Sequence, residues 1–173
     1  YYVDSRGRKR TSSYYVDYDE GIYVGYRYYE TRGADDEQWY NKNVVYPFGF
    51  GKSYADFDWE ITPPTDTALT ADGTLTFNVK VTNKSDSQYS GKDVVQLYYT
   101  APYTSGEIEK SHVVLGGFAK TKLLAPGESD TVTIDMKVSE MKSYDYNDAN
   151  GNGNRGYELD SGKYTLHIAH SAH

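Results

Sequence analysis

The chain contains 173 residues, carries a formal net charge of −7 at pH 7 and has no cysteine. One β-sandwich of roughly 100 residues with an extension fits this length, two such cores do not, and the lack of cysteine excludes a disulfide framework. The acidic balance argues against a nucleic-acid partner, because phosphate binding requires a basic surface that releases counterions.

Residues 1–50 lack an alternation long enough to define a strand, and we interpret them as a connector. Within them, Ile22, Val24, Tyr26 and Tyr28 alternate with other residues, which predicts a short strand or an extended segment. No helix is expected here. A basic cluster near the start lies in a polar stretch rich in Ser and Gly, which favours a solvated segment over a site for an anionic partner. Its members are Arg6, Arg8, Lys9 and Arg10.

The sequence starts at Tyr1 without an initiator methionine, so we expect it to be part of a longer protein. No run approaches the roughly 20 apolar residues of a membrane helix, and no signal peptide opens the chain, so no membrane partner is expected. A chain without cysteine is typical of a bacterial-type protein, either in the cytoplasm or secreted without disulfides, so the location stays open.

From Asp56 onward, apolar side chains occupy every second position, as a half-buried antiparallel strand requires. This alternation predicts five strands, carrying Phe57, Trp59 and Ile61; Leu75, Phe77, Val79 and Val81; Val95, Leu97 and Tyr99; Val132, Ile134, Met136 and Val138; and Tyr164, Leu166 and Ile168. Residues 112–119 and 144–146 are weaker strand candidates, and one helical turn is expected near 139–143. About seven short strands with Pro- and Gly-containing turns predict an all-β, immunoglobulin or fibronectin type III-like sandwich over residues 51–173.

Two acidic triplets are the candidates for acid–base catalysis, which needs paired carboxyl groups in different environments. They are Asp17, Asp19 and Glu20, and Asp35, Asp36 and Glu37. Both triplets lie in polar segments, and nothing in the sequence desolvates one member of either triplet. We therefore interpret them as solvated surface and assign no catalytic residue.

Oxygen-bearing side chains at alternate positions, Asp148, Asn150 and Asn152, resemble the first half of a calcium loop with Gly153 at position 6. Position 12 is Leu159, where such a loop has a bidentate glutamate, and Asn-Gly pairs are common in hairpins. We favour a hairpin or a loose loop and keep the calcium site as the weaker alternative.

The four histidines give no further metal set. Three of them follow one another at a spacing of three, which alternates sides of a strand, so we expect no convergence on a metal ion. They are His167, His170 and His173, and the fourth is His112. No cofactor is expected.

Several motifs follow one another in an order that resembles the C-terminal region of the family 3 glycoside hydrolases, the β-glucosidase-like enzymes. Glu20-Gly-Ile-Tyr-Val-Gly-Tyr-Arg-Tyr-Tyr29 resembles the segment that leaves their α/β sandwich domain, and Tyr46-Pro-Phe-Gly-Phe-Gly-Lys-Ser-Tyr54 resembles the start of their third domain. Their fibronectin type III-like domain is matched by Asp93-Val-Val-Gln-Leu-Tyr-Tyr99, Leu115-Gly-Gly-Phe118 and Leu124-Ala-Pro-Gly-Glu128. Lys52 and His112 depart from the family pattern, which often has leucine and proline at these positions.

The resemblance implies that both catalytic carboxyl groups lie in a catalytic region outside this chain, to which residues 1–50 connect. It implies a non-catalytic module that braces the catalytic domains of an enzyme hydrolysing β-glycosidic bonds in carbohydrate breakdown. We expect hydrolysis from the longer protein and none from this chain alone. A docking module exposes an aromatic patch when isolated, for which the candidates are Tyr23, Tyr26, Tyr28, Phe48 and Phe50.

A carbohydrate-binding module is the alternative function, because aromatic rings in loops can stack on sugar rings of an oligosaccharide. The aromatic residues expected in loops are Trp39, Tyr40, Tyr89 and Tyr103. Aromatic rings in the loops of a sandwich often close its open ends instead, and we favour that interpretation. The expected partners are thus the catalytic domains and, under the alternative, an oligosaccharide.

Overall fold

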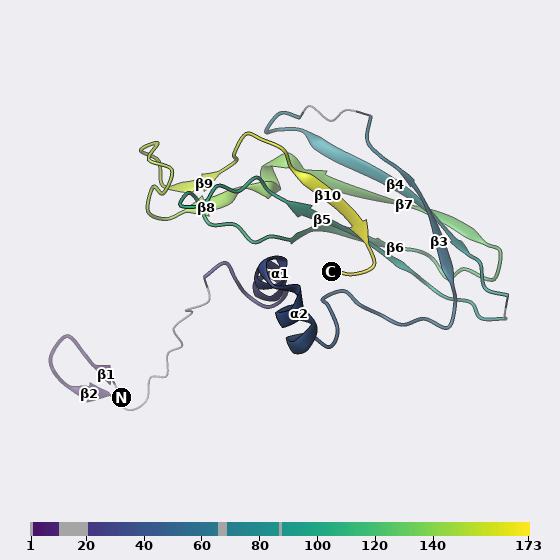
Figure 1. Cartoon of the computed structure of the whole chain (residues 1–173), viewed down its shortest axis with the longest axis horizontal. Helices are drawn as coiled ribbons and strands as arrows, with labels where there is room; N and C mark the ends of the chain where they lie inside the picture. Colours follow the sequence, from purple (N-terminus) through teal and green to yellow (C-terminus); the bar gives the residue numbers. More distant parts are fainter. Residues whose placement is uncertain (1, 11–20, 66–68, 87) are drawn as a thin grey trace.

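The computed structural model describes residues 2–10, 21–65, 69–86 and 88–173. Two antiparallel three-stranded sheets face each other and form the predicted all-β sandwich (Figure 1). One sheet has the order β3-β4-β7, with β3 at Phe57–Thr62, β4 at Thr74–Asn83 and β7 at Ser129–Lys137. The other has the order β10-β5-β6, with β10 at Thr165–Ala169, β5 at Val94–Thr100 and β6 at Val114–Lys120. All five strands predicted from alternation are confirmed, and β6 confirms the weaker candidate at residues 112–119.

Smaller elements complete the described chain. A 3₁₀ helix at Val138–Met141, η1, confirms the helical turn expected near residues 139–143. It leads into β8 at Ser143–Asp145, which pairs with β9 at Gly156–Glu158 in a two-stranded ribbon. At the start of the chain, β1 at Tyr2–Val3 pairs with β2 at Lys9–Arg10.

The core lies between the two sheets, where the alternating apolar residues of the sequence meet. Its central side chains, from β4 and β5, are completely buried: Val79, Val81, Val95 and Leu97. Burying one such side chain contributes about 1.5 to 3 kcal/mol to stability. The period-two pattern therefore determines which face of each strand turns inward.

Two glycines in β6 allow that strand to approach β7 closely. A Cβ atom at Gly116 would overlap Sδ of Met136, and one at Gly117 would lie 2.8 Å from Cγ2 of Ile134. The pairing of β5 with β6 shifts register between Leu97 and Tyr98, which is a β-bulge. The Gly116-Gly117 pair of the Leu115-Gly-Gly-Phe118 motif thus has a packing role that only residues without a Cβ can fill.

Two helices between residues 26 and 43 were not expected. The prediction of a strand or extended segment through Tyr28 is wrong, because α1 runs from Tyr26 to Asp35 and α2 from Glu37 to Asn43. The inward side of α1 carries Tyr26, Glu30 and Gly33, which are four and three residues apart as helical periodicity requires. Glu30 is charged and Gly33 has no side chain, so the inward side of α1 lacks the apolar stripe by which an amphipathic helix is predicted from sequence.

Candidate docking surface

Helices α1 and α2, the segment 44–50 and the C-terminal residues form a layer beside the β10-β5-β6 sheet, away from β3, β4 and β7 (Figure 1). Tyr26 anchors α1 in this layer. Its ring stacks on Phe48 with centroids 4.3 Å apart and meets Tyr98 edge-on at 6.5 Å. Its hydroxyl accepts a hydrogen bond from the backbone N–H of Leu115 at 2.9 Å. One side chain therefore connects α1, the Pro-Phe-Gly segment and two strands.

Gln96, buried on the outer face of β5, holds the segment that follows the helices. Its Nε2 donates to the backbone oxygens of Gly49 at 3.1 Å and His170 at 2.7 Å. Its Oε1 accepts from the hydroxyl of Tyr98 at 2.6 Å. Burial is the main reason that the pKa of the Tyr98 phenol is raised to about 12, with smaller contributions from Tyr26 and Glu30. Gln96 therefore fixes both the 44–50 segment and the C-terminal segment against the sheet.

A polar cluster joins the two helices to the end of the chain. Glu30 is only 4% exposed, yet its carboxylate accepts from the Tyr40 hydroxyl at 2.5 Å and lies 3.1 Å from Nδ1 of His173. The His173 ring stacks on Tyr40 with centroids 3.9 Å apart. Burial, followed by the hydrogen bond to Glu30, raises the pKa of the Tyr40 phenol well above its usual value. The cluster locks α1, α2 and the C-terminal segment into one unit.

The outer side of this layer presents a set of aromatic side chains that we call the aromatic face: Tyr28, Tyr29, Trp39, Tyr46, Phe48 and Phe50. Tyr29 stacks on Trp39 at 5.9 Å, and Tyr46 stacks on Phe50 at 5.1 Å. A cavity of about 420 Å³ lined by Tyr29, Tyr46 and Phe48 lies between the two stacked pairs. Tyr46 is 63% exposed, and Phe48 and Phe50 are each 45% exposed. Contiguous exposed rings of this kind are typical of an interaction surface.

The five residues predicted for docking lie in different places. Tyr28, Phe48 and Phe50 belong to the aromatic face, whereas Tyr26 points inward as the anchor of α1. Tyr23 is half-buried, and burial, followed by Glu109 and Tyr103, raises its pKa. The prediction omitted Tyr29 and Tyr46, although Tyr46 opens the very motif in which the aromatic residues cluster.

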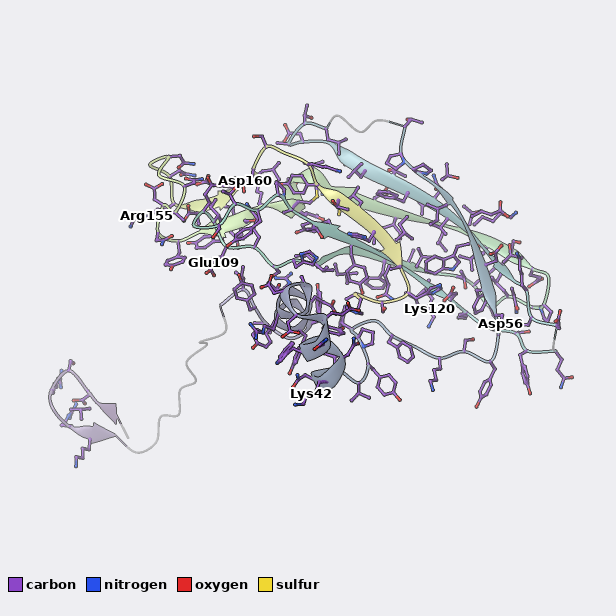
Figure 2. All side chains as sticks on the ribbon, viewed as in Figure 1. Lys42, Asp56, Glu109, Lys120, Arg155 and Asp160 are labelled. Atoms are coloured by element: carbon purple, nitrogen blue, oxygen red, sulfur yellow. The ribbon has the colours of Figure 1, made fainter. Side chains whose placement is uncertain are left out.

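The four residues predicted for sugar contact do not converge. Trp39 and Tyr40 lie in α2, so their expected placement in loops is wrong, and Tyr40 is buried at 3% exposure. Tyr89 packs on Tyr54 in the loop that leaves β4, near Asp56. Tyr103 lies in the same loop as Glu109, and Figure 2 shows Asp56 and Glu109 at opposite ends of the sandwich. Trp39 alone joins the aromatic face.

The acidic triplets contribute no paired carboxyl groups in the described residues. Asp35, Asp36 and Glu37 are exposed, and the carboxylate of Asp36 caps α2 by accepting from the backbone N–H of Trp39 at 2.9 Å. Asp17, Asp19 and Glu20 lie outside the described residues.

A second cavity, of about 580 Å³, lies where the sandwich opens beside Leu69 and Tyr164.

In the described ranges, no group of three histidine, cysteine, aspartate or glutamate side chains is arranged to hold a metal ion. Asp148, Asn150 and Asn152 lie in the loop of the β8–β9 ribbon, which confirms the hairpin interpretation of this stretch. The expectation that the histidines diverge is only partly right. His170 lies on Trp59, but His112, His167 and His173 line one cavity of about 260 Å³, because β10 ends at Ala169 and the chain then turns.

Among the described residues, no helix has the length and apolar composition needed to cross a bilayer.

Comparison with known proteins gives consistent matches. Residues 93–172 match the family model described as "Fibronectin type III-like domain". The chain is 45% identical to "Beta-glucosidase A" of Butyrivibrio fibrisolvens over 76% of its own length and 16% of that protein's. It is 37% identical to "Beta-glucosidase" of Rhizobium radiobacter over 91% of its length and 17% of the relative. The chain therefore spans about a sixth of these relatives.

Solved structures give the same result. A β-glucosidase from Paenibacillus barengoltzii superposes with a TM-score of 0.76 at 42% identity, over 89% of this chain and 16% of that one. A structure described as a GH3 beta-glucosidase from Bifidobacterium adolescentis superposes with a TM-score of 0.67 at 29% identity, over 88% of this chain and 19% of that one. Because these matches cover nearly nine-tenths of the chain, they extend well beyond residues 93–172, which match the fibronectin type III-like model.

Proposed function

Because this chain is the region of the family 3 glycoside hydrolases that includes their fibronectin type III-like domain, we propose that it is a non-catalytic module that braces the catalytic domains of a β-glucosidase-like enzyme. The enzyme would hydrolyse β-glycosidic bonds, as the names of the relatives indicate for those proteins. The division into a connector over residues 1–50 and a sandwich over residues 51–173 forms part of this proposal.

The observation that carries the proposal is the aromatic face. Its rings lie on a layer that Tyr26, Glu30 and Gln96 fix to the sheet, so they are held in one orientation. A flexible connector would lose conformational entropy on docking, whereas a fixed surface loses little. More than four-fifths of each relative described above lies outside the part that this chain covers. The remainder of the enzyme is therefore the natural occupant of this face.

The test is complementation between this chain and a fragment carrying the rest of its parent enzyme. We expect the chain to slow thermal inactivation of chromogenic β-glucoside hydrolysis by the fragment, and the double substitution Y46S/F50S to abolish this protection. F118S is the matched control, since Phe118 in β6 is 66% exposed but lies outside the aromatic face. Equal protection by the wild type and Y46S/F50S, or loss of protection with F118S alone, would contradict the proposal.

Carbohydrate contact is a second candidate function. Of the four residues predicted to contact sugars, only Trp39 has a packing environment that favours it. Tyr28 and Tyr29 surround Trp39 at 5.9 Å each, and the guanidinium of Arg32 lies 5.6 Å from its ring centroid. Trp59 is the other tryptophan, so fluorescence of a W59F variant reports on Trp39 alone. A saturable change with gluco-oligosaccharides would support sugar binding, and an unchanged spectrum would leave bracing as the function.

A further inference from the structure

The loop between β8 and β9 contains the two Asn-Gly pairs of the sequence, Asn150-Gly151 and Asn152-Gly153. Asparagine is a thermolabile residue, and it is most reactive before glycine, because no Cβ hinders the glycine nitrogen as it approaches the asparagine side chain. Both glycines and Asn152 are exposed, so water reaches them. Figure 2 shows the loop residue Arg155 at the outer end of the sandwich, beyond the β8–β9 ribbon.

Three side-chain amides of this loop, those of Asn150, Asn152 and Asn154, are held by one carboxylate. Oε2 of Glu158 accepts from Nδ2 of Asn150 at 3.0 Å and from Nδ2 of Asn152 at 2.7 Å. Oε1 of Glu158 accepts from Nδ2 of Asn154 at 3.1 Å. The carbonyl oxygens of Asn150 and Asn152 also accept backbone N–H groups two residues ahead, at 3.1 and 2.7 Å. Both asparagine side chains are therefore fixed at each end.

The glycine nitrogens that would attack these side chains are also engaged, both with Asp148. The N–H of Gly151 donates to the backbone oxygen of Asp148 at 3.1 Å, and the N–H of Gly153 donates to Oδ1 of Asp148 at 3.0 Å. Each of these hydrogen bonds holds the N–H proton on an Asp148 oxygen and thereby opposes the deprotonation that the attack on Cγ requires. The native loop opposes the reaction that its sequence favours.

We propose that Asn150 and Asn152 are sites of spontaneous deamidation and that Glu158 controls its rate by keeping the loop closed. In the reaction, the glycine nitrogen bonds to Cγ of the asparagine, the Cγ–Nδ2 bond breaks, and the glycine N–H proton leaves with the amide nitrogen as ammonia. Water then opens the resulting succinimide to aspartate or isoaspartate.

Deamidation would reverse the role of Glu158. A new carboxylate at position 150 or 152 removes an amide donor to Oε2 and places a second negative charge beside it, which is repulsive. This repulsion would open the loop. Because Glu158 is paired with Ser143 across the ribbon, opening of the loop would also disturb the pairing of β8 with β9. The rate of deamidation therefore determines how long the β8–β9 ribbon stays intact. This inference does not depend on the proposed bracing function.

The test is peptide mapping by mass spectrometry of the whole chain during incubation in mildly alkaline buffer. We expect the wild type to deamidate at Asn150 and Asn152 more slowly than a peptide of residues 146–157, and E158A to accelerate both sites about tenfold, because hydrogen bonds to a charged acceptor are lost. E158Q, which keeps one acceptor oxygen, should give an intermediate rate. Asn154 is the internal reference, since it also contacts Glu158 but precedes Arg155.

The matched control is E107A, which removes an exposed glutamate from the loop between β5 and β6 and should leave both rates unchanged. Circular dichroism of each variant shows whether the chain is still folded, and so distinguishes opening of the loop from unfolding of the chain. If E158A unfolds, E158Q serves as the test. Equal rates in the wild type and the Glu158 variants, or a wild-type rate as fast as that of the peptide, would overturn the proposal.

Discussion

The hydroxyl oxygen of Tyr40 lies 2.5 Å from Oε1 of Glu30, and this hydrogen bond joins α2 to α1 beneath the C-terminal segment. Gly33 permits the contact, since a Cβ there would lie 2.5 Å from Cδ2 of Tyr40. A buried carboxylate is costly unless it is paired and hydrogen-bonded. The helical layer therefore depends on a polar contact inside it as well as on aromatic packing.

Substituting Tyr40 by phenylalanine tests this dependence. Y40F keeps the ring but removes the donor to Glu30, so we expect the free energy of unfolding to fall by about 1 to 3 kcal/mol. Urea denaturation measures the change. Y46F is the matched control, since Tyr46 is exposed, and it should change the value by less than about 0.5 kcal/mol. Equal effects of Y40F and Y46F would show that Glu30 does not need this donor.

Glycine is required at position 49, whereas alanine should be tolerated at position 51. Gly49 has φ of +83°, and a Cβ there would overlap Oε1 of Gln96 and lie 2.9 Å from the hydroxyl of Tyr98. We expect G49A to destabilise the chain by about 1 to 3 kcal/mol and to release the 44–50 segment. G51A should be close to neutral, because a Cβ at Gly51 meets nothing within 4 Å. Proton NMR of Phe48 and thermal unfolding report both effects.

Alkaline pH should weaken the fold through Tyr98. Its pKa is raised from 10.0 to about 12 in the folded chain, so the unfolded chain loses its phenolic proton first. Stability is then fully present below pH 10 and falls as pH rises towards 12. Urea denaturation across this range measures the decline. Y98F should be less stable than the wild type below pH 10 but should lose less stability above it, and an equally steep decline would assign the effect to other tyrosines.

Acid should loosen the β8–β9 ribbon through Asp145. Burial of this carboxyl works to raise its pKa, but hydrogen bonds from the backbone N–H groups of four loop residues prevail and lower it below 3.8. The pKa is thus lower in the folded state, so the contribution to stability is present above about pH 3.8 and is lost as pH falls further.

Amide chemical shifts of Asn147 and Ala149, which donate to the Asp145 carboxylate at 2.8 to 3.1 Å, should report the acid transition. D145N should remove this pH dependence while weakening the loop at neutral pH. D72N is the control, because Asp72 is exposed in the turn before β4. A D145N variant with the acid response of the wild type would contradict the assignment.

The sequence predicted the sandwich because its strands bury one face each, and period-two alternation records that burial directly. The same reasoning failed for residues 26–43, where helix formation depends on contacts with distant residues. Tyr26 meets Leu115, Thr31 accepts from the N–H of His112, and Glu30 meets His173. None of these pairs is visible in a local window of sequence, and Tyr26 and Tyr28 imitate a strand.

The aromatic face was predicted in part for a related reason. The cluster of rings in the Tyr46-Pro-Phe-Gly motif is evident from sequence, and Phe48 and Phe50 were identified from it. The inward orientation of Tyr26 depends on Phe48 and Tyr98, which lie 22 and 72 positions further along the chain. Composition can thus indicate an aromatic surface, whereas the side on which each ring lies depends on tertiary packing.

Strand β5 separates two interiors, and this determines how the molecule should open. Its residues 95–99 are all buried, with Val95, Leu97 and Tyr99 in the sandwich core and Gln96 and Tyr98 under the helical layer. Loss of either interior would expose one face of the same strand. Amide hydrogens of β5 should consequently be among the last to exchange with deuterium, and they should exchange together with those of α1, as expected of a single cooperative unit.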